Sequence, residues 1–260
     1  MTPLDVLVLT LIFFCTSVIS VVTGATSLIT VPALLAFGVP ATTALGTNML
    51  ALTVMSVGAS VPFWRGDALD RLRLPLLLGL TGAGSLLGAL LVFVVPPALL
   101  PLIIAAAMLV VAVVVLRPGR TAAALQAPTR QRQVVGYGLT LLLAVYGGFF
   151  SGGYVTLLTA AFLTTFRLPF LRAVATTKVI NVASSLVATV IFATRGAVDW
   201  RLGVVLSGVM YAGATIGARW TLRLEERRIR QLFVATVLLL ALKTLVLDVP
   251  WARLVSGQGL

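Results

Sequence analysis

A single lysine stands inside an apolar stretch of this chain, with hydroxyl and amide side chains around it. Lys178 follows Thr176 and Thr177 and precedes Asn181 by three residues. Residues three and four apart share a helical face, so Thr177, Lys178 and Asn181 project in similar directions. A lysine at a bilayer centre costs about 2.5–3.5 kcal/mol and usually has a partner or a task, and an anion would be a natural partner. Arg172 is only six residues away, however, so the alternative is that Lys178 reaches the cytosolic interface.

Two glycine-containing turns form a second set of polar positions, Thr23–Ser27 and Ser151–Thr156. Each leads into a short apolar stretch, Ala25–Phe37 or Gly153–Phe166, which is too short for a comfortable crossing and suits a re-entrant or broken helix. Free amides at the start of such a half-helix favour an anion. The structural alternative is that Gly and Ser only let helices pack closely, but their recurrence beside two short stretches favours function.

These turns, together with the polar residues that open the following stretches, are the predicted substrate-binding residues. They are Gly24, Ala25, Thr26, Ser27, Thr47, Asn48, Gly152, Gly153, Tyr154, Thr156, Thr176, Thr177, Lys178 and Asn181. The chain has no histidine, one cysteine, and no Asp or Glu in the interior of an apolar stretch. This inventory excludes a Ser-His-Asp, zinc-protease or carboxylate-pair enzyme, so we expect no catalytic residue, no metal site and no cofactor.

The two halves of the chain repeat each other. When the second half is laid on the first with one constant offset, Gly24 aligns with Gly153, Pro40 with Pro169, Thr47 with Thr176, Gly84 with Gly213 and Gly88 with Gly217. We call two residues paired by this offset repeat equivalents. We therefore expect a first transmembrane repeat at 1–116, a cytosolic linker at 117–133 and a second repeat at 134–260. Paired halves in a hydrophobic chain are typical of a transporter whose substrate site lies where the halves meet.

The composition identifies the solvent of this chain as a lipid bilayer. Hydrophobic residues make up 60% of the sequence and charged residues 10%, and apolar stretches of helical span length recur. The sequence predicts an all-α polytopic membrane protein. A net charge of +12 could indicate a nucleic-acid partner, but the arginines lie in short loops between apolar stretches, which favours a role in membrane orientation and no nucleic acid.

Each half contains five apolar segments. They are Leu4–Thr23, Ala25–Phe37, Ala41–Trp64, Leu74–Val95 and Ala98–Leu116, then Val134–Phe149, Gly153–Phe166, Ala173–Thr194, Leu202–Trp220 and Leu232–Leu247. If the first two segments of each half form a hairpin, 14 of the 19 basic residues share one face. If they form one continuous span, the basic residues divide almost evenly. The distribution of basic residues therefore favours the hairpin topology. This topology predicts that both termini lie outside the cytosol and that the second half is an inverted copy of the first.

Three stretches of this sequence resemble the sulfite exporter TauE/SafE family of membrane transporters. They are Gly24–Pro32, Ala44–Asn48 and Arg172–Asn181, and the resemblance covers nearly all of the chain. It implies export of sulfite, or of small organosulfonates such as sulfoacetate, across the bacterial cell membrane. One departure is Ala175, which aligns with Gly46 and puts exact mirror symmetry of the site in doubt.

We therefore expect a secondary transporter of a small sulfur-containing anion that works by alternating access. Three alternatives stay open at this point. An anion channel could use the same fold, a membrane-embedded enzyme would need a cofactor for its acids and bases, and a non-transporting membrane subunit would leave the paired turns unexplained. The sequence fixes neither the coupling ion nor the oligomeric state.

Overall fold

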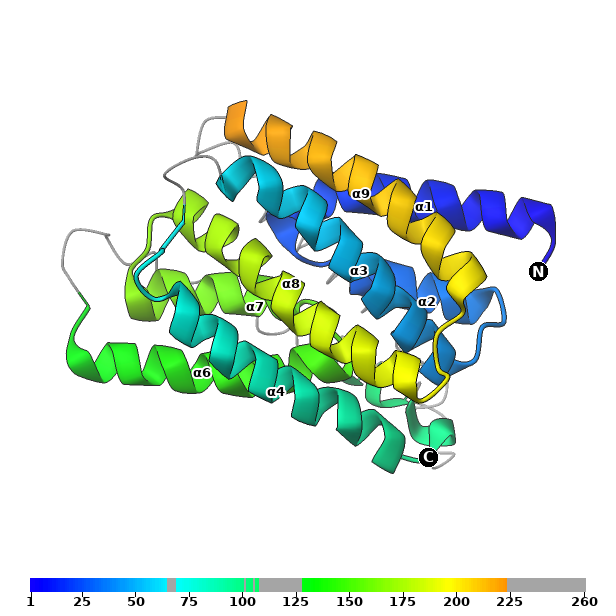
Figure 1. Cartoon of the computed structure of the whole chain (residues 1–260), viewed down its shortest axis with the longest axis horizontal. Coiled ribbons are helices and arrows are strands. Elements are labelled where there is room, and N and C mark those ends of the chain that lie inside the picture. The colour runs from blue at the N-terminus through cyan, green and yellow to red at the C-terminus, as the bar shows by residue number, and fades with distance from the viewer. Residues whose placement is uncertain (65–68, 101, 105, 108–127, 224–260) are drawn as a thin grey trace, which may run out of the picture.

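The fold is known from a computed structural model, which describes residues 1–64, 69–100, 102–104, 106–107 and 128–223 (Figure 1). These residues form helices joined by short loops, and this part of the chain has no strand. The elements are α1 Pro3–Thr23, α2 Ser27–Ala36, α3 Ala41–Trp64, α4 Leu74–Val94, η1 Pro97–Leu99, α6 Arg130–Phe149, α7 Tyr154–Ala161, η2 Phe162–Phe166, α8 Phe170–Thr194 and α9 Trp200–Arg223. The prediction of an all-helical chain is thus confirmed.

Five of these helices are long and apolar enough to cross a membrane. They contain Pro3–Val21, Ala41–Trp64, Leu74–Val94, Phe170–Thr194 and Trp200–Arg223. Ser27–Ala36 and Tyr154–Phe166 are apolar but shorter. Leucines and valines on the outer helices are exposed, for example Leu7 and Leu11 on α1 and Leu91 on α4, as expected of a surface that faces lipid tails. The chain is a multi-pass membrane protein.

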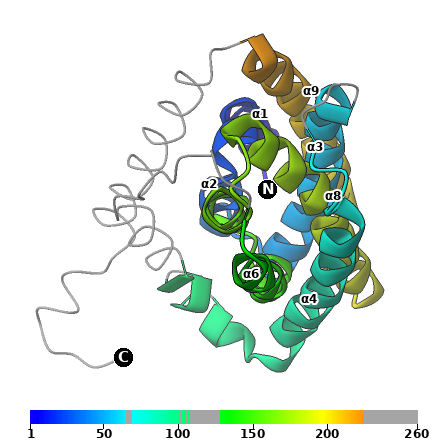
Figure 2. The ribbon, with the colours of Figure 1, turned by 90° about the vertical axis from the view of Figure 1, so that its left-hand side faces the viewer.

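The helices stand in two layers. Figure 2 looks along the bundle and shows α9, α3, α8 and α4 as one curved row, with α1, α2 and α6 facing its inner side. Within the row α3 packs on α9 and α8, and α8 packs on α4; across the layers α1 packs on α9 and α6 packs on α4. Helices α3 and α8 are the most deeply buried of the candidate spans. The polar residues that they carry are therefore shielded from lipid.

Helix partners are exchanged between the two halves of the sequence. On α4, a Cβ at Gly88 would lie 1.9 Å from the carbonyl oxygen of Val145 on α6; on α9, a Cβ at Gly217 would lie 2.2 Å from that of Val18 on α1. Gly88 and Gly217 are repeat equivalents, so the same glycine contacts the opening helix of the other half in each case. Helices α1 and α6 begin at opposite ends of the bundle (Figure 1).

A pair of reciprocal hydrogen bonds joins the halves again. The Thr47 hydroxyl accepts from the backbone N–H of Asp199 at 3.0 Å, and the Thr176 hydroxyl accepts from that of Asp70 at 3.1 Å. The two threonines are repeat equivalents, and so are the two aspartates, which makes this the same contact formed twice. Each half thereby fixes the loop that precedes a long helix of the other.

We expect Gly88→Ala to separate α4 from α6, because the new methyl group would overlap backbone atoms that cannot move aside as a side chain can. Overpacking of this kind typically costs about 1–3 kcal/mol. Gly82→Ala on the same helix is the matched control, since nothing lies within 4 Å of its Cβ position. Replacing a helical glycine there should stabilise the helix by about 0.5–1 kcal/mol. Thermal unfolding in detergent measures both, and an equal shift for the two variants would contradict the close packing.

Several helix boundaries differ from those expected. Helix α6 begins at Arg130, inside the range assigned to the linker, because the Thr129 hydroxyl accepts from the backbone N–H of Arg132 and caps the helix. Helix α8 begins at Phe170, directly after Pro169 and before the expected start at Ala173. The expected fifth segments of the two halves are Ala98–Leu116 and Leu232–Leu247. Most of the first and all of the second lie outside the described residues.

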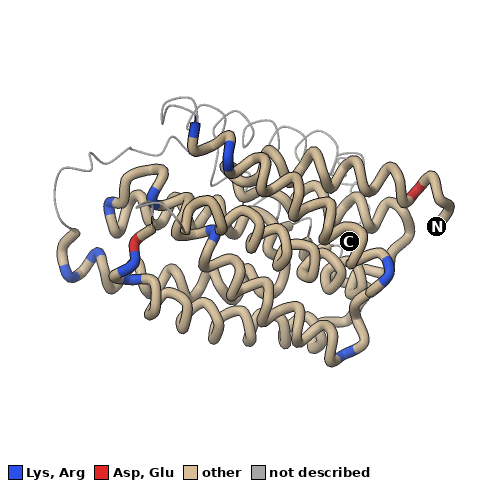
Figure 3. The backbone as a smooth tube through the Cα atoms, turned by 45° about the horizontal axis from the view of Figure 1, so that its top comes forward, with Lys and Arg blue, Asp and Glu red and all other residues tan. Residues whose placement is uncertain are grey.

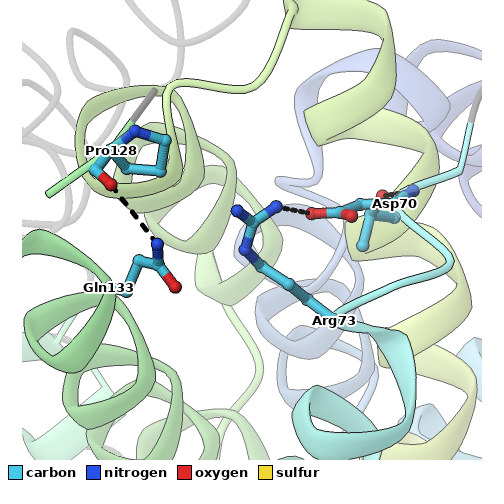
Figure 4. Close-up of polar contacts among 5 residues, drawn as sticks. Asp70, Arg73, Pro128 and Gln133 are labelled. Atoms are coloured by element: carbon cyan, nitrogen blue, oxygen red, sulfur yellow. Dashed lines mark hydrogen bonds and ion pairs between the residues drawn. The ribbon is translucent and has the colours of Figure 1, made fainter. Parts of the chain in front are cut away.

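Basic residues gather at one end of the bundle, where Figure 3 shows most of the Lys and Arg positions. At this end α4, α6 and α8 begin and α9 ends. Arg73, next to the start of α4, forms an ion pair with Asp70 at 2.6 Å (Figure 4). Its guanidinium also lies over the ring of Phe166, 5.2 Å from the ring centre. Beside it, the side-chain amide of Gln133 donates to the carbonyl of Pro128 at 3.3 Å. The opposite end has only Arg195 and Arg201 among the described residues.

Candidate functional site

The first polar turn separates α1 from α2. Helix α1 ends at Gly24, which has φ of +69° and donates its N–H to the carbonyl of Ser20 at 2.8 Å. Only glycine adopts this backbone conformation at little cost. In the described part of the chain, the N–H groups of Ala25, Thr26 and Ser27 have no acceptor. Three unused donors thus stand at the positive end of the α2 dipole.

The second turn separates α6 from α7 and lies against the first. Ser151 and Gly153 have φ of +63° and +75°, and α7 begins at Tyr154. The Tyr146 hydroxyl donates to the carbonyl of Gly152 and holds the turn. The Thr156 hydroxyl donates to the carbonyl of Thr23 in the other turn. The two broken helices therefore meet end to end inside the bundle.

A small pocket lies where the two turns meet. Its free space in this structure is small, about the room of one water molecule. Its lining residues come from both halves and are Gly24, Thr26, Ser27, Leu52, Met55, Ser151, Val155, Lys178 and Asn181. No carboxylate is among them, and Lys178 is the one ionisable group of this lining.

Lys178 is buried in this pocket with 2% of its surface exposed, so its side chain does not extend to the outside of the bundle. The Nζ atom donates to the carbonyl of Ser20 at 2.7 Å. That carbonyl belongs to the last turn of α1, the negative end of the helix dipole, where a cation is stabilising. Lys178 thus closes the end of α1 and lines the same pocket as Thr26 and Ser27 at the start of α2.

Asn181, one helical turn further along α8, supplies a polar amide with one end free. Its Nδ2 group donates to the Ser56 hydroxyl on α3 at 2.7 Å, while Oδ1 has no hydrogen-bond partner among the described residues. Buried amide atoms normally have partners, so a free end in a pocket indicates a place for a bound molecule. The two ends of the amide can be exchanged, because the Ser56 hydroxyl can donate to Oδ1 as well as accept from Nδ2.

Asn48 and Thr177 brace the short helices and do not line the pocket. Asn48 donates to the Ser27 hydroxyl at 2.9 Å and accepts from the Thr30 hydroxyl at 2.7 Å. The Thr177 and Thr159 hydroxyls lie 3.2 Å apart. Since Thr30 and Thr159 are repeat equivalents, this contact recurs in both halves. Because Ser27 accepts from Asn48, its own O–H stays free to donate toward the pocket.

The structure thus divides the predicted binding residues. Gly24, Thr26, Ser27, Lys178 and Asn181 line the pocket. Ala25, Gly152, Gly153 and Thr156 form or join the two turns, and the buried ring of Tyr154 packs against Gly147. Thr47 and Thr176 instead hold the loops at Asp199 and Asp70, so the structure does not bring them to the pocket.

Sequence reasoning missed four of the lining residues, which are Leu52, Met55, Ser151 and Val155. Leu52 had one usable indication, because it is the repeat equivalent of Asn181. Ser151 stood within the predicted second turn, and its positive φ marks the place where that turn bends. Val155 also stood within that predicted turn, whereas Met55 is an ordinary apolar residue whose type does not point to a pocket.

A multi-pass helical protein in which two broken helices meet at a buried pocket that contains a lysine has the architecture of a membrane transporter. Residues 9–244 match the family model described as Sulfite exporter TauE/SafE, and the chain belongs to this family.

Curated relatives match over most of their length as well. A "Probable membrane transporter protein" of Haemophilus influenzae is 28% identical over 238 residues, which cover 92% of this chain and 93% of the relative. "Probable membrane transporter protein ORF9" of Sinorhizobium sp is 30% identical over 236 residues, or 89% of each chain. "Probable membrane transporter protein YfcA" of Escherichia coli K12 is 28% identical over 249 residues, 94% of this chain and 91% of the relative. No solved structure matches the chain. This protein is therefore a membrane transporter.

Proposed function

We propose that the protein is a secondary transporter that exports a small sulfur-containing anion, such as sulfite or an organosulfonate, by alternating access. One observation carries the proposal: the buried amine of Lys178 lines the same pocket as Thr26 and Ser27, whose backbone N–H groups have no acceptor in the described residues. The matched family is described as a sulfite exporter, which supplies the substrate class.

The pocket chemistry favours an oxyanion over a neutral or cationic solute. The amides at the start of α2 carry partial positive charge, the Ser27 hydroxyl can donate, and Lys178 adds a full charge. With the Asn181 amide turned so that Ser56 donates to Oδ1, its NH₂ group would add two more donors. Sulfite and sulfonate oxygens are acceptors without protons to donate, so they match such a set of donors.

Export agrees with the membrane potential of a cell that is negative inside. Moving one elementary charge across the membrane is worth about 2.3 kcal/mol per 100 mV, and the field drives an anion outward. An exporter of anions therefore has a driving force without a coupling ion. This matters because the interiors of the described helices lack the Asp, Glu and His residues that usually relay protons.

The exchange of helix partners between the halves supports alternating access. The reciprocal glycine contacts, the reciprocal threonine bonds and the opposite starting ends of α1 and α6 all support two inverted repeats. In this proposal the hairpins α1–α2 and α6–α7 enter from opposite faces and meet at the pocket. Rocking of one repeat against the other would expose the pocket to one face at a time.

The basic end of the bundle should face the cytosol of the cell membrane, because Lys and Arg in short loops are retained there. Both termini would then be extracytoplasmic. A reporter that is active only outside the cytosol, fused after Leu260, should be active. A fusion within the expected linker at 117–133 is the control and should be silent. Activity in the linker fusion alone would reverse the orientation.

Purified protein in liposomes should carry sulfite at a rate that saturates with concentration, because each carrier must complete a conformational cycle per anion. Protein-free liposomes and a monovalent cation as test solute are the controls. A flux that rises linearly at high sulfite would instead favour the anion channel. Absence of flux for sulfite, sulfoacetate and taurine would contradict the proposed substrate class.

A further inference from the structure

We propose that the substrate route runs along the contact between α3 and α8, in two repeat-related arms that leave the pocket toward opposite ends of the bundle. The α3 arm consists of Ser56 and Ser60, and the α8 arm of Ser185 and Thr189. The inference rests on the proposed function and adds the path by which the anion would reach and leave the pocket.

The two arms are equivalent in sequence. Ser56 and Ser185 are repeat equivalents, as are Ser60 and Thr189, and within each arm the two positions lie one helical turn apart and so share a helical face. All four side chains are between 1% and 8% exposed. Hydroxyl groups at such depth have no water to bind, so their repetition in both halves calls for an explanation.

Hydrogen bonding differs between the arms. In the α8 arm, Ser185 donates to the carbonyl of Asn181 at 2.6 Å and Thr189 to that of Ser185 at 2.7 Å. The Thr189 hydroxyl also lies 3.1 Å from that of Thr53 on α3, which ties the two helices together. Every hydroxyl of this arm is occupied, which is the ordinary way in which serine and threonine fit inside a membrane helix.

In the α3 arm the hydroxyls keep unused capacity. The Ser56 oxygen accepts from Asn181 Nδ2, but its own O–H donates to no acceptor in the described part of the chain. The Ser60 hydroxyl is buried and has no partner there either. Unpaired buried hydroxyls are rare because each costs about 1–3 kcal/mol. A solute that accepts hydrogen bonds would satisfy these two hydroxyls, which the described side chains do not.

Asn181 connects both arms to the pocket. It lines the pocket, bonds to Ser56 through its side chain and accepts from Ser185 through its carbonyl. From this point α3 continues to the basic end and α8 to the opposite end (Figure 1). The α3 arm thus leads to one face and the α8 arm to the other. When access switches from one face to the other, the unpaired hydroxyls of the α3 arm would become hydrogen-bonded and those of the α8 arm would become unpaired.

Single cysteines test this route directly. Cys15 is the only native cysteine, so Cys15→Ser gives a background without thiols. Ser60→Cys and Thr189→Cys probe the two arms. Ser207→Cys is the matched control, because its hydroxyl is similarly buried and unpaired but belongs to α9, which is neither α3 nor α8. The reagent is sulfonatoethyl methanethiosulfonate, an impermeant anion, applied from either side of oriented vesicles. Gel filtration first verifies that each variant folds like the background.

We expect Ser60→Cys to react from the face at the basic end and Thr189→Cys from the opposite face, with Ser207→Cys inert. A cysteine in the arm that is closed in the major conformation reacts only while a minor conformation opens that arm. Minor conformations are typically populated at about 0.1–10%, so we expect this cysteine to react at about that fraction of the rate of a free thiol. Sulfite should slow both reactions. Two inert arms, labelling no faster than at Ser207→Cys, or labelling of both arms from one face would overturn the route.

The failure of the route and the failure of the proposed function give different results. Saturable sulfite flux together with unreactive cysteines would support the proposed function but contradict the α3–α8 route. Labelling from opposite faces without sulfite flux or sulfite protection would keep the route and remove sulfite as the substrate. Ser60→Ala gives a second readout, since a path residue should lower flux while a packing residue should leave it unchanged.

Discussion

Lys178→Met should lower sulfite flux into proteoliposomes by about 10- to 150-fold, the equivalent of losing a charged hydrogen bond worth about 1.5–3 kcal/mol. Methionine is the appropriate replacement because Met49 occupies the equivalent position in the other half of the chain. The fold therefore accommodates this side chain at a buried position of the same kind. Flux and sulfite binding by calorimetry measure the effect.

The control for Lys178→Met separates binding from helix capping. Without the ammonium, the Ser20 carbonyl keeps only the N–H of Gly24, so a loss of stability of about 1 kcal/mol is expected from capping alone. Lys178→Arg keeps the charge on a longer, planar group and should retain part of the binding. A Lys178→Met protein that is less stable but transports normally would show that Lys178 only completes α1.

Gly24→Ala should abolish transport, whereas Gly38→Ala should be tolerated. Both glycines have positive φ, +69° and +81°, so both substitutions carry the left-handed backbone cost of about 1–2 kcal/mol. At Gly38 nothing lies within 4 Å of the new Cβ. At Gly24 the Cβ would lie 2.6 Å from Val155 Cβ and 2.9 Å from the backbone nitrogen of Thr156, which forces the two turns apart. Because these turns line the pocket, the displacement should cost transport as well as stability.

Thermal unfolding and sulfite flux of the two glycine variants give the comparison. The difference between their unfolding free energies isolates the contact between the turns, because the backbone cost is common to both. We expect Gly24→Ala to lose about 1–3 kcal/mol more than Gly38→Ala. Equal losses in stability together with equal flux would mean that the turns do not depend on each other.

The breaks in the helices were predictable because they depend on local chemistry. Gly24 and Gly153 stand where a left-handed residue ends or begins a helix, and each precedes a segment that is too short to span. For Lys178, local chemistry permitted two placements, in the membrane core or at the interface. Burial of the side chain and its bond to Ser20 in the other half of the chain place it inside the helix bundle.

Long-range contacts explain where sequence reasoning failed. Thr47 and Thr176 are hydroxyl residues near the start of a helix, which is where a binding residue could also stand. Their hydrogen-bond partners, however, lie in the loops of the other half. Asn48 and Thr177 contact residues of α2 and α7 and brace these helices behind the pocket, which their residue types alone did not indicate. The duplication itself stays a prediction, which the reciprocal contacts support.

The interlocking of the halves has a consequence for biogenesis. Helix α4 packs on α6, and α9 packs on α1. A polypeptide that stopped before residue 128 would therefore leave the glycine face of α4 exposed to lipid. We therefore expect quality-control proteases to degrade a chain that ends after the first half. Separate fragments 1–127 and 128–260, made in the same cell, should protect each other from degradation, whereas either fragment alone should disappear in a pulse-chase experiment.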